Sequence, residues 1–253
     1  MTTQATRRVT SDSLRGIFRN LRADFLTRVL VAVPTESVYS SFMPTSSVTR
    51  ILLATSSSGK LRDFAGAARQ RNVEIATLPA FAAVPPATED GATFEENARK
   101  KAEYYSRFAS GEMVLADDSG LEVDALNGAP GVRSARFAAT GEQGNSSDAA
   151  NNIRLLHEMA RVPDGERTAR FVCVIAAAQD GTVLGTFRGE AAGKILRVPR
   201  GAGGFGYDPL FLLPKLNKTF SELTPEEKAG VSHRGAAFRM FLDWLTAREQ
   251  RTA

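Results

Sequence analysis

From residue 50 onward, short apolar runs alternate with stretches in which apolar residues recur at helical spacing. The runs have the length of single strands, and Ile, Leu and Val dominate them. The first expected strands are "RILLAT" at 50–55, "VEIATL" at 73–78 and "MVLAD" at 113–117. Later, Asp180-Gly181 separates two β-rich parts of 169–195, which predicts an antiparallel hairpin.

Helical periodicity fills the segments between and after these strands. Thr93 and Glu96 form a Thr-x-x-Glu capping box, so we expect a helix to begin near residue 94, and Glu96 is better explained as a cap than as a ligand. Asp148 is expected to cap a second helix, with His157 on its surface rather than in a metal site. Further helices are expected over 60–72 and 236–250, the latter for core or dimer packing. This alternation predicts an α/β fold with a mixed β-sheet and flanking helices.

Residues 1–49 differ from the rest in composition. Apolar residues from Leu14 to Val29 recur at helical spacing with Arg residues between them, which resembles a transit peptide. Three acidic residues argue against that interpretation. We expect a dispensable or over-called extension, with Met43 an alternative start, and a single enzymatic domain over 50–250.

Composition and charge exclude several classes of protein. The chain has 253 residues, 43% of them hydrophobic, and no apolar run approaches the roughly 18 residues of a membrane helix. Cys173 is the only cysteine, so no internal disulfide forms, and a cytoplasmic location is expected. Of the formal net charge of +4, residues 1–49 supply +3, so the main body shows no basic patch for a nucleic-acid polymer.

Two adjacent carboxylates, Asp117 and Asp118, stand where the strand at 113–117 is expected to end. Because neighbouring carboxylates repel each other, a bound cation would make the pair tolerable. The alternative is an exposed turn, since Asp, Ser and Gly favour turns. For Asp117 alone, two structural roles are as well supported as a functional one: a turn residue, or a carboxylate that orients a metal ligand without contacting the metal.

Two glycine motifs resemble nucleotide-binding patterns but lack features that those patterns require. Gly59-Lys60 resembles the end of a P-loop, but Ala54 and Leu61 stand where that motif needs Gly and Ser or Thr. A hydroxyl-rich turn at a helix N-terminus can nevertheless bind phosphate. "GAGGFG" at 201–206 matches a dinucleotide-binding pattern, yet Pro209 and a strand-like run follow it instead of a helix. It leaves a glycine loop with an aromatic face.

Five stretches, taken in order, resemble the inosine triphosphate pyrophosphatase family. They are "ILLATSSSGKLRDF", "TEDGATFEENARKKA", "LADDSGLEVDALNGAPGVRSARF", "GGFGYDPLF" and "LTPEEKAGVSHRG". The resemblance runs from about Ile51 to Trp244 and implies two lobes around a central nucleotide cleft. It also implies Mg²⁺-dependent hydrolysis of non-standard purine nucleoside triphosphates (ITP, dITP, XTP) to the monophosphate and pyrophosphate, with one Mg²⁺ per subunit of a homodimer.

The resemblance assigns roles residue by residue. Glu89 and Asp118 would hold the metal ion, and Asp118 would accept the proton of the attacking water. Ser57 departs from the family, which usually has Asn at this position, and this puts the phosphate geometry there in question. The substrate-binding residues would be Thr55, Ser56, Ser57, Ser58, Gly59, Lys60, Lys101 and Ser119 for the phosphates and sugar, and Phe205, Gly206, Tyr207, Asp208, Lys228, His233 and Arg234 for the base.

Physical chemistry supports these roles, although each residue has a plainer alternative. A triphosphate carries about four negative charges, so its cleavage requires cations and a positioned water, and Mg²⁺ prefers carboxylate and water oxygens. Lys228 and Arg234 could instead be solvated surface charges, and Phe205 plain core. As a whole, the chain could instead be a non-enzymatic nucleotide-binding or RNA-associated protein.

Overall fold

The structure is a computed structural model that describes residues 49–68, 71, 73–140 and 144–252. These residues lie within one compact unit, Ser46–Ala253. The extension, the helix expected within it and the alternative start at Met43 lie outside the described residues. None of the described helices is long and apolar enough to cross a membrane.

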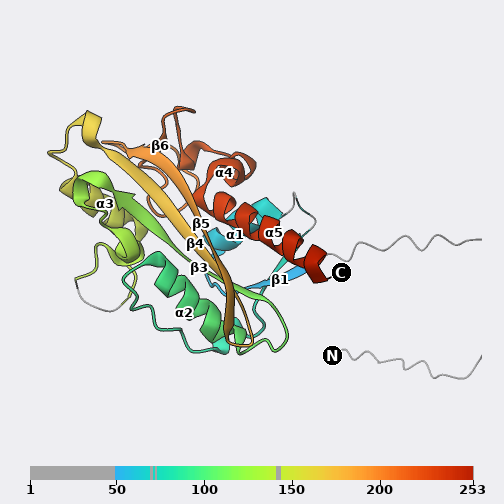
Figure 1. The fold of residues 1–253 in the computed structure, drawn as a ribbon. Coiled ribbons are helices and arrows are strands. Elements are labelled where there is room, and N and C mark those ends of the chain that lie inside the picture. Colours follow the sequence, from blue (N-terminus) through green and yellow to red (C-terminus); the bar gives the residue numbers. More distant parts are fainter. Residues whose placement is uncertain (1–48, 69–70, 72, 141–143, 253) are drawn as a thin grey trace, which may run out of the picture. The chain divides into compact units, whose positions relative to one another are not determined.

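A seven-stranded mixed sheet forms the centre of the fold, as predicted (Figure 1). Strand β1 pairs in parallel with β2 and β3, whereas the pairs from β3 to β7 are antiparallel, in the order β2-β1-β3-β4-β5-β6-β7. The strands are β1 (Thr49–Leu53), β2 (Val73–Thr77), β3 (Val114–Val123), β4 (Thr168–Gln179), β5 (Thr182–Ile195), β6 (Phe211–Leu213) and β7 (Lys218–Thr219).

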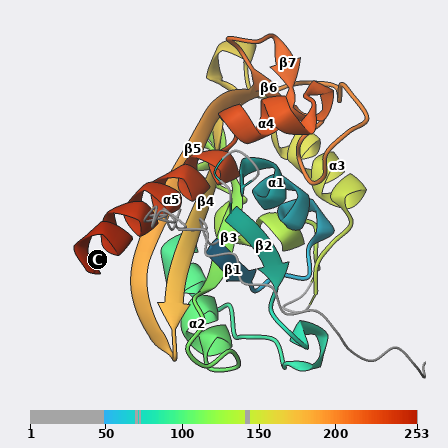
Figure 2. The same cartoon turned by 90° about the vertical axis from the view of Figure 1, so that its right-hand side faces the viewer.

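Helices cover both faces of this sheet. The helices are α1 (Ser58–Ala68), α2 (Phe94–Ser106), α3 (Asp148–Glu158), α4 (Pro225–Val231) and α5 (His233–Thr252). Helix α2 packs on one face of β3 and β4, and α1 and α5 pack on the other (Figure 1). Helix α4 lies beside β7 at one end of the sheet, where Glu227 pairs with Lys218 (Figure 2). Short 3₁₀ turns occupy Phe81–Ala83, Asp124–Leu126, Gly131–Arg136, Asp164–Glu166 and Phe220–Glu222.

Three buried apolar clusters hold these layers together. Leu115 belongs to the cluster under α1 and α5, and Ala116 belongs to the cluster under α2. Leu121, further along the same strand, belongs to a third cluster with residues from α3 and β6. The segment between Ala116 and Leu121 therefore lies where all three clusters meet.

Strand β3 is longer than the sequence pattern predicts, and the expected strand end at Asp117 is wrong. Asp117 and Asp118 lie inside the strand and pair with Ile175 and Val174 of β4. Ser119-Gly120 would favour a turn in isolation, but ten consecutive antiparallel pairs with β4 hold the segment extended. The exposed-turn interpretation of the two aspartates is therefore excluded.

The predicted hairpin and the cap at Thr93 are confirmed, but Glu96 accepts the Ala92 N–H rather than the Thr93 N–H of a full capping box. A second cap is displaced by a residue. Asp180 and Gly181 both have positive φ, as a tight hairpin turn requires. The Thr93 side chain accepts the Glu96 N–H at the start of α2. Ser147, not Asp148, caps α3 by accepting the Ala150 N–H.

Candidate active site

The turn between β1 and α1 places hydroxyl groups and a lysine at a helix N-terminus. Ser57 Oγ accepts the Lys60 N–H at 3.3 Å, and Thr55 Oγ1 accepts the Ser57 N–H at 3.2 Å. Ser57 therefore caps α1, a task for which Ser and Asn are about equally suited. Ser57 in place of the Asn that the resemblance leads one to expect is thus compatible with the same local backbone, and Ser56 and Ser58 remain exposed beside it.

Asp117 and Asp118 direct their carboxylates to opposite faces of the sheet, because successive strand residues alternate. Asp117 Oδ2 lies on the α1 and α5 side, 2.9 Å from Lys60 Nζ, and accepts the Ser119 hydroxyl at 3.2 Å. Asp118 lies on the α2 side. Each carboxylate thus has its own cation, which makes the pair tolerable within the protein.

On the α2 side, Asp118 and Glu89 share a single ammonium group. Lys101 Nζ lies 2.9 Å from Glu89 Oε2 and 3.5 Å from Asp118 Oδ1. Asn97, one turn earlier on α2, donates its side-chain N–H to Asp118 Oδ2 at 3.0 Å. Three of the predicted site residues therefore meet at one point, together with Asn97, which the sequence analysis did not single out.

On the α1 and α5 side, six charged side chains form a continuous series, here called the charge chain. Its members alternate in sign and come from α1, β3, α4, α5 and the glycine loop. In order they are Lys60, Asp117, Arg234, Asp63, Lys228 and Asp208, with successive N–O distances of 2.9, 3.9, 3.1, 3.6 and 2.7 Å.

Lys228 and Arg234 are only 6% exposed each, so they are not the solvated surface charges of the alternative interpretation. Arg234 also donates to Ser119 Oγ at 2.9 Å, which connects the charge chain to a further predicted site residue. Asp63 holds both Lys228 and Arg234 but was missed in the sequence. Its position three residues after Lys60, on the first turns of α1, was the available signal.

The two adjacent aspartates differ in their electrostatics. Burial raises the pKa of Asp118, and the nearby Lys101, Lys60 and Asn97 only partly oppose this effect. Burial also acts on Asp117, but there Lys60, Arg234 and Lys101 together outweigh it and lower the pKa. A pair of carboxylates whose pKa values are driven apart suits different roles, with Asp118 the better proton acceptor and Asp117 a permanent anion.

The glycine loop places Phe205 against the phosphate-side turn. A side chain at Gly59 would come within 2.7 Å of the Phe205 ring, so these two residues are in close contact. Lys228 Nζ and the Arg234 guanidinium each lie 5.0 Å from the centre of that ring. Phe205 is half-buried and is surrounded by predicted site residues, which argues against a plain core role.

Asp208 fixes the shape of the glycine loop. It accepts the Phe205 N–H at 3.0 Å as well as the Lys228 ammonium. Gly204 has φ of 77°, and a side chain there would meet Asp208 Oδ2, so this position requires glycine. Gly206 donates its N–H to Asp148 Oδ2 at 2.6 Å. Asp148, which was expected to cap α3, therefore holds the glycine loop instead.

Two predicted base-pocket residues lie in the core. Tyr207 is 4% exposed, and its hydroxyl donates to the Ser134 carbonyl at 2.8 Å. His233 is 1% exposed and stacks on Phe171, with ring centres 4.8 Å apart. Burial lowers the pKa of His233 well below its usual value, so the imidazole is neutral. In this structure both residues pack in the core next to the site residues Asp208 and Arg234, which follow them in the sequence. Their contact with a base stays a prediction.

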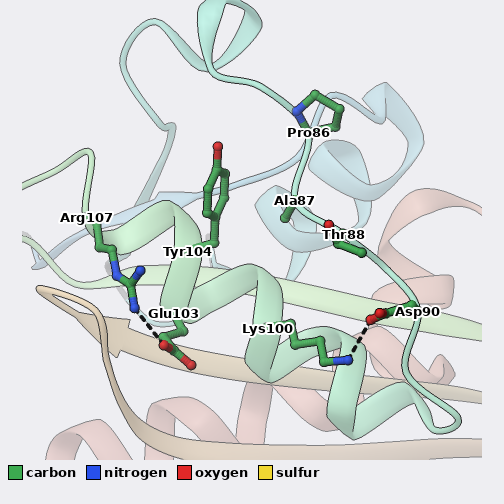
Figure 3. A pocket seen from close by; sticks show the side chains of 8 residues that line it. All are labelled: Pro86, Ala87, Thr88, Asp90, Lys100, Glu103, Tyr104 and Arg107. Atoms are coloured by element: carbon green, nitrogen blue, oxygen red, sulfur yellow. Dashed lines mark hydrogen bonds and ion pairs between the residues drawn. The ribbon is translucent and has the colours of Figure 1, made fainter.

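A surface pocket of about 440 Å³ lies on another side of α2 and is a separate feature (Figure 3). Its lining includes Asp90 and Lys100, which flank the site residues Glu89 and Lys101 in the sequence. Figure 3 shows its charges paired with each other, Lys100 with Asp90 and Arg107 with Glu103. These pairs neutralise the charges that could attract a triphosphate.

The donor set on the α2 side suits a magnesium ion. Within the described part of the chain, no three His, Cys, Asp or Glu side chains are grouped to hold a metal ion. Mg²⁺ needs no such group, because one or two carboxylates, waters and substrate phosphates usually hold it. Glu89 and Asp118 already converge on one cation, the Lys101 ammonium.

Comparison with protein families gives a match to the Ham1 family model over residues 51–244. A protein of Acidobacterium capsulatum named dITP/XTP pyrophosphatase is 53% identical over 196 residues, which cover 76% of this chain and 96% of that protein. A protein of the same name from Geobacter sulfurreducens is 49% identical over 198 residues, with 78% and 97% covered.

Solved structures show the same architecture. The Staphylococcus aureus Ham1 protein superposes with a TM-score of 0.67 at 38% identity, covering 79% of this chain and all of that chain. A Mycobacterium abscessus protein described as a nucleoside-triphosphatase and dITP/XTP pyrophosphatase gives a TM-score of 0.58 at 40% identity, with 77% and 99% covered. The matched region contains every predicted site residue.

Proposed function

Because the chain belongs to the Ham1 family, we propose that it hydrolyses dITP, XTP and ITP to the monophosphate and pyrophosphate. The relatives named dITP/XTP pyrophosphatase match over nearly their whole length, which supports this reaction class. The observation that carries the proposal is the convergence of Glu89 and Asp118 on the Lys101 ammonium, with Lys60 and the rest of the charge chain on the other face of β3.

Mg²⁺ dependence is part of the proposal, with Glu89 and Asp118 as the protein ligands and one ion per subunit. When bound, the ion would neutralise phosphate charge and lower the pKa of a neighbouring water. Such a site explains why Glu89 and Asp118 lie together, since Lys101 alone cannot neutralise two carboxylates. ITP hydrolysis assayed with and without EDTA tests this dependence.

The protein's own residues would perform the remaining steps. Lys60, the N-terminus of α1 and the hydroxyls of Thr55 and Ser58 would bind the phosphates, because free N–H groups and cations attract anions there. Asp118 would take the proton of the water that attacks the α-phosphorus, whose bond to the pyrophosphate oxygen then breaks. Its raised pKa favours proton acceptance.

The base would lie against Phe205, near Lys228 and Arg234. The Phe205 ring would stack on any base, and the cations would contact its polar edge. Both cations are held by Asp63, so their directions are fixed before the substrate arrives.

The decisive experiment is incubation of the purified protein with ITP and Mg²⁺ while pyrophosphate and monophosphate are measured. We expect equal amounts of both products, and a folded Asp118→Asn protein serves as the inactive control. If neither product forms, the proposed reaction is wrong and a binding role replaces it.

A homodimer and a cytoplasmic location complete the proposal. The family resemblance supports the dimer, and the buried lone thiol of Cys173 is compatible with a reducing compartment. Light scattering after size-exclusion chromatography would measure the oligomeric state, and cell fractionation would measure the location.

A further inference from the structure

Asn97 is a buried polar residue that contacts both sides of the carboxylate site. It lies on α2 and is 1% exposed. Its side-chain oxygen accepts the Gly91 N–H at 2.8 Å, and its side-chain nitrogen donates to Asp118 Oδ2 at 3.0 Å. The partners determine the amide orientation, because a backbone N–H only donates and an ionised carboxylate only accepts.

These two bonds connect parts of the chain that carry different ligands. Gly91 follows Glu89 by two residues in the loop before α2, whereas Asp118 lies on β3. Glu89 itself is 42% exposed at its side chain and has no strand or helix to hold it. The Asn97 side chain therefore joins the loop of Glu89 to the strand of Asp118.

Asn97 and Lys101 also divide the two oxygens of Asp118 between them. They are four residues apart on α2 and thus lie on the same helix face. Asn97 holds Oδ2, and Lys101 lies nearer to Oδ1, which leaves Oδ1 directed toward the cation that it shares with Glu89.

We propose that Asn97 is a positioning residue of the metal site, which locks Asp118 Oδ2 and the Gly91 backbone so that Asp118 Oδ1 and Glu89 converge where a metal ion would bind. The inference rests on the proposed function for the presence of that metal ion. Loss of Asn97 would free Glu89 and Asp118 to move apart. This should weaken metal binding more than it lowers the rate at which the bound substrate is hydrolysed.

The test compares Asn97→Ala with the intact protein in two measurements. The first is binding of Mn²⁺, as a stand-in for Mg²⁺, to the substrate-free protein, followed by the paramagnetic resonance of free Mn²⁺. The second is ITP hydrolysis as a function of Mg²⁺ concentration. In Asn97→Ala we expect the affinity for Mn²⁺ to fall at least tenfold and the Mg²⁺ concentration that gives half-maximal activity to rise at least tenfold. We expect kcat at saturating Mg²⁺ to stay within about threefold of the intact protein.

A second variant disturbs the same connection without altering Asn97. A methyl group at Gly91 would lie 2.7 Å from Asn97 Oδ1 and 2.8 Å from the Glu96 Cβ, so Gly91→Ala displaces the loop from the amide. It should weaken Mn²⁺ binding in the same direction, and it decides the question if Asn97→Ala does not fold.

Ser106→Ala is the matched control. Ser106 is also fully buried on α2, and its hydroxyl accepts the Gly181 N–H at 2.9 Å, far along the helix from Asp118. It should lower thermal stability without changing Mn²⁺ affinity. Affinity within twofold of the intact protein in the folded Asn97 and Gly91 variants, or an equal loss in Ser106→Ala, overturns the inference. An intact protein that binds Mn²⁺ but leaves ITP unchanged contradicts the proposed function instead.

Discussion

Asp117 and Asp118 are neighbours in strand β3, yet their carboxylates lie on opposite faces of the sheet and contact different lysines, Lys60 and Lys101. The alternation of side chains along a strand thus separates two charges that adjacent sequence positions bring together. Asp117 stabilises the charge chain, whereas Asp118 forms the proposed metal site with Glu89 near α2. Substitution of Asp117 should therefore mainly lower stability, and substitution of Asp118 should mainly lower activity.

Asp118→Asn should abolish most of the activity while it preserves the fold. An amide cannot accept the proton of the attacking water, and loss of a general base costs on the order of 10²–10⁴ in rate. Because burial raises the pKa of Asp118 and Lys101 keeps Glu89 as a partner, removal of the Asp118 charge should leave the free energy of unfolding within about 1 kcal/mol or increase it. Steady-state kinetics and urea denaturation measure both. Turnover close to that of the intact protein would remove Asp118 from the mechanism.

Asp117→Asn should instead destabilise the protein. Lys60 and Arg234 would lose their buried partner, which costs about 3 kcal/mol when one member of such a pair is removed. The folded-state pKa of Asp117 is lowered, so its contribution is present above the unfolded pKa of about 3.9 and is lost as pH falls through the lower folded value. Urea denaturation at pH 7 and at acidic pH should show the difference shrink. Equal stability at pH 7 would contradict this role.

The acid limb of kcat/KM should report the raised pKa of Asp118. Only the ionised carboxylate accepts a proton, so the rate should fall on acidification at a pH above the ordinary value of an aspartate. Lys101→Met should move this limb further upward, because the Lys101 ammonium is the first of the groups that lower the Asp118 pKa. Rate profiles of both proteins at limiting Mg²⁺, where the metal-free protein sets kcat/KM, provide the test, and a downward movement in the variant would refute the assignment.

Lys228 and Arg234 should impose preference for 6-oxo purines. Hypoxanthine and xanthine present an acceptor at O6 to these cations, whereas adenine presents an amino donor, which would face the Lys228 and Arg234 cations without an acceptor. A buried site that leaves polar groups unpaired can reject a substrate by about 10⁴-fold. We therefore expect kcat/KM for ITP and XTP to exceed that for ATP by a large factor.

The ratio of ITP to ATP should fall in Lys228→Ala and Arg234→Ala. Lys218→Ala is the control, because Lys218 is an exposed lysine that is paired with Glu227. An unchanged ratio in both buried-site variants would assign selectivity to other residues. GTP shares the 6-oxo edge, so its rejection must depend on the 2-amino group.

Removal of residues 1–42 should leave activity intact, since the family match begins at residue 51. The rate of ITP hydrolysis by a chain that starts at Met43 measures this. A folded protein that loses more than about tenfold in rate, or ~1.4 kcal/mol of transition-state stabilisation, would show that the extension contributes to function.

Local signals predicted much of this fold. The hairpin at Asp180-Gly181 and the cap at Thr93 depend on residues close in sequence, and both are confirmed. The end of β3 was placed too early because Ser119 and Gly120 favour a turn, and only pairing with β4, some 50 residues later, overrides them. Ser147 and Asp148 are both good caps, so the sequence could not choose between them.

The missed site residues share a dependence on distant partners. Asp63 meets Arg234 across 171 positions, and no local pattern links them. Asn97 lies in the first turn of an expected helix, where polar residues are common for reasons unrelated to a functional site. Its contact with Asp118 exists only because the fold brings β3 next to α2.

The charge chain has a thermodynamic consequence for recognition. Its four inner members are each shared between two neighbours, and its ends are Lys60 beside the phosphate turn and Asp208 under the glycine loop. A base that draws Lys228 away from Asp208 changes the partners left for Asp63 and Arg234, and a phosphate that draws Lys60 away from Asp117 does the same from the other end. The two ends of a nucleotide should therefore bind cooperatively, so that the affinities of a separate base and a separate triphosphate do not sum to that of the whole substrate.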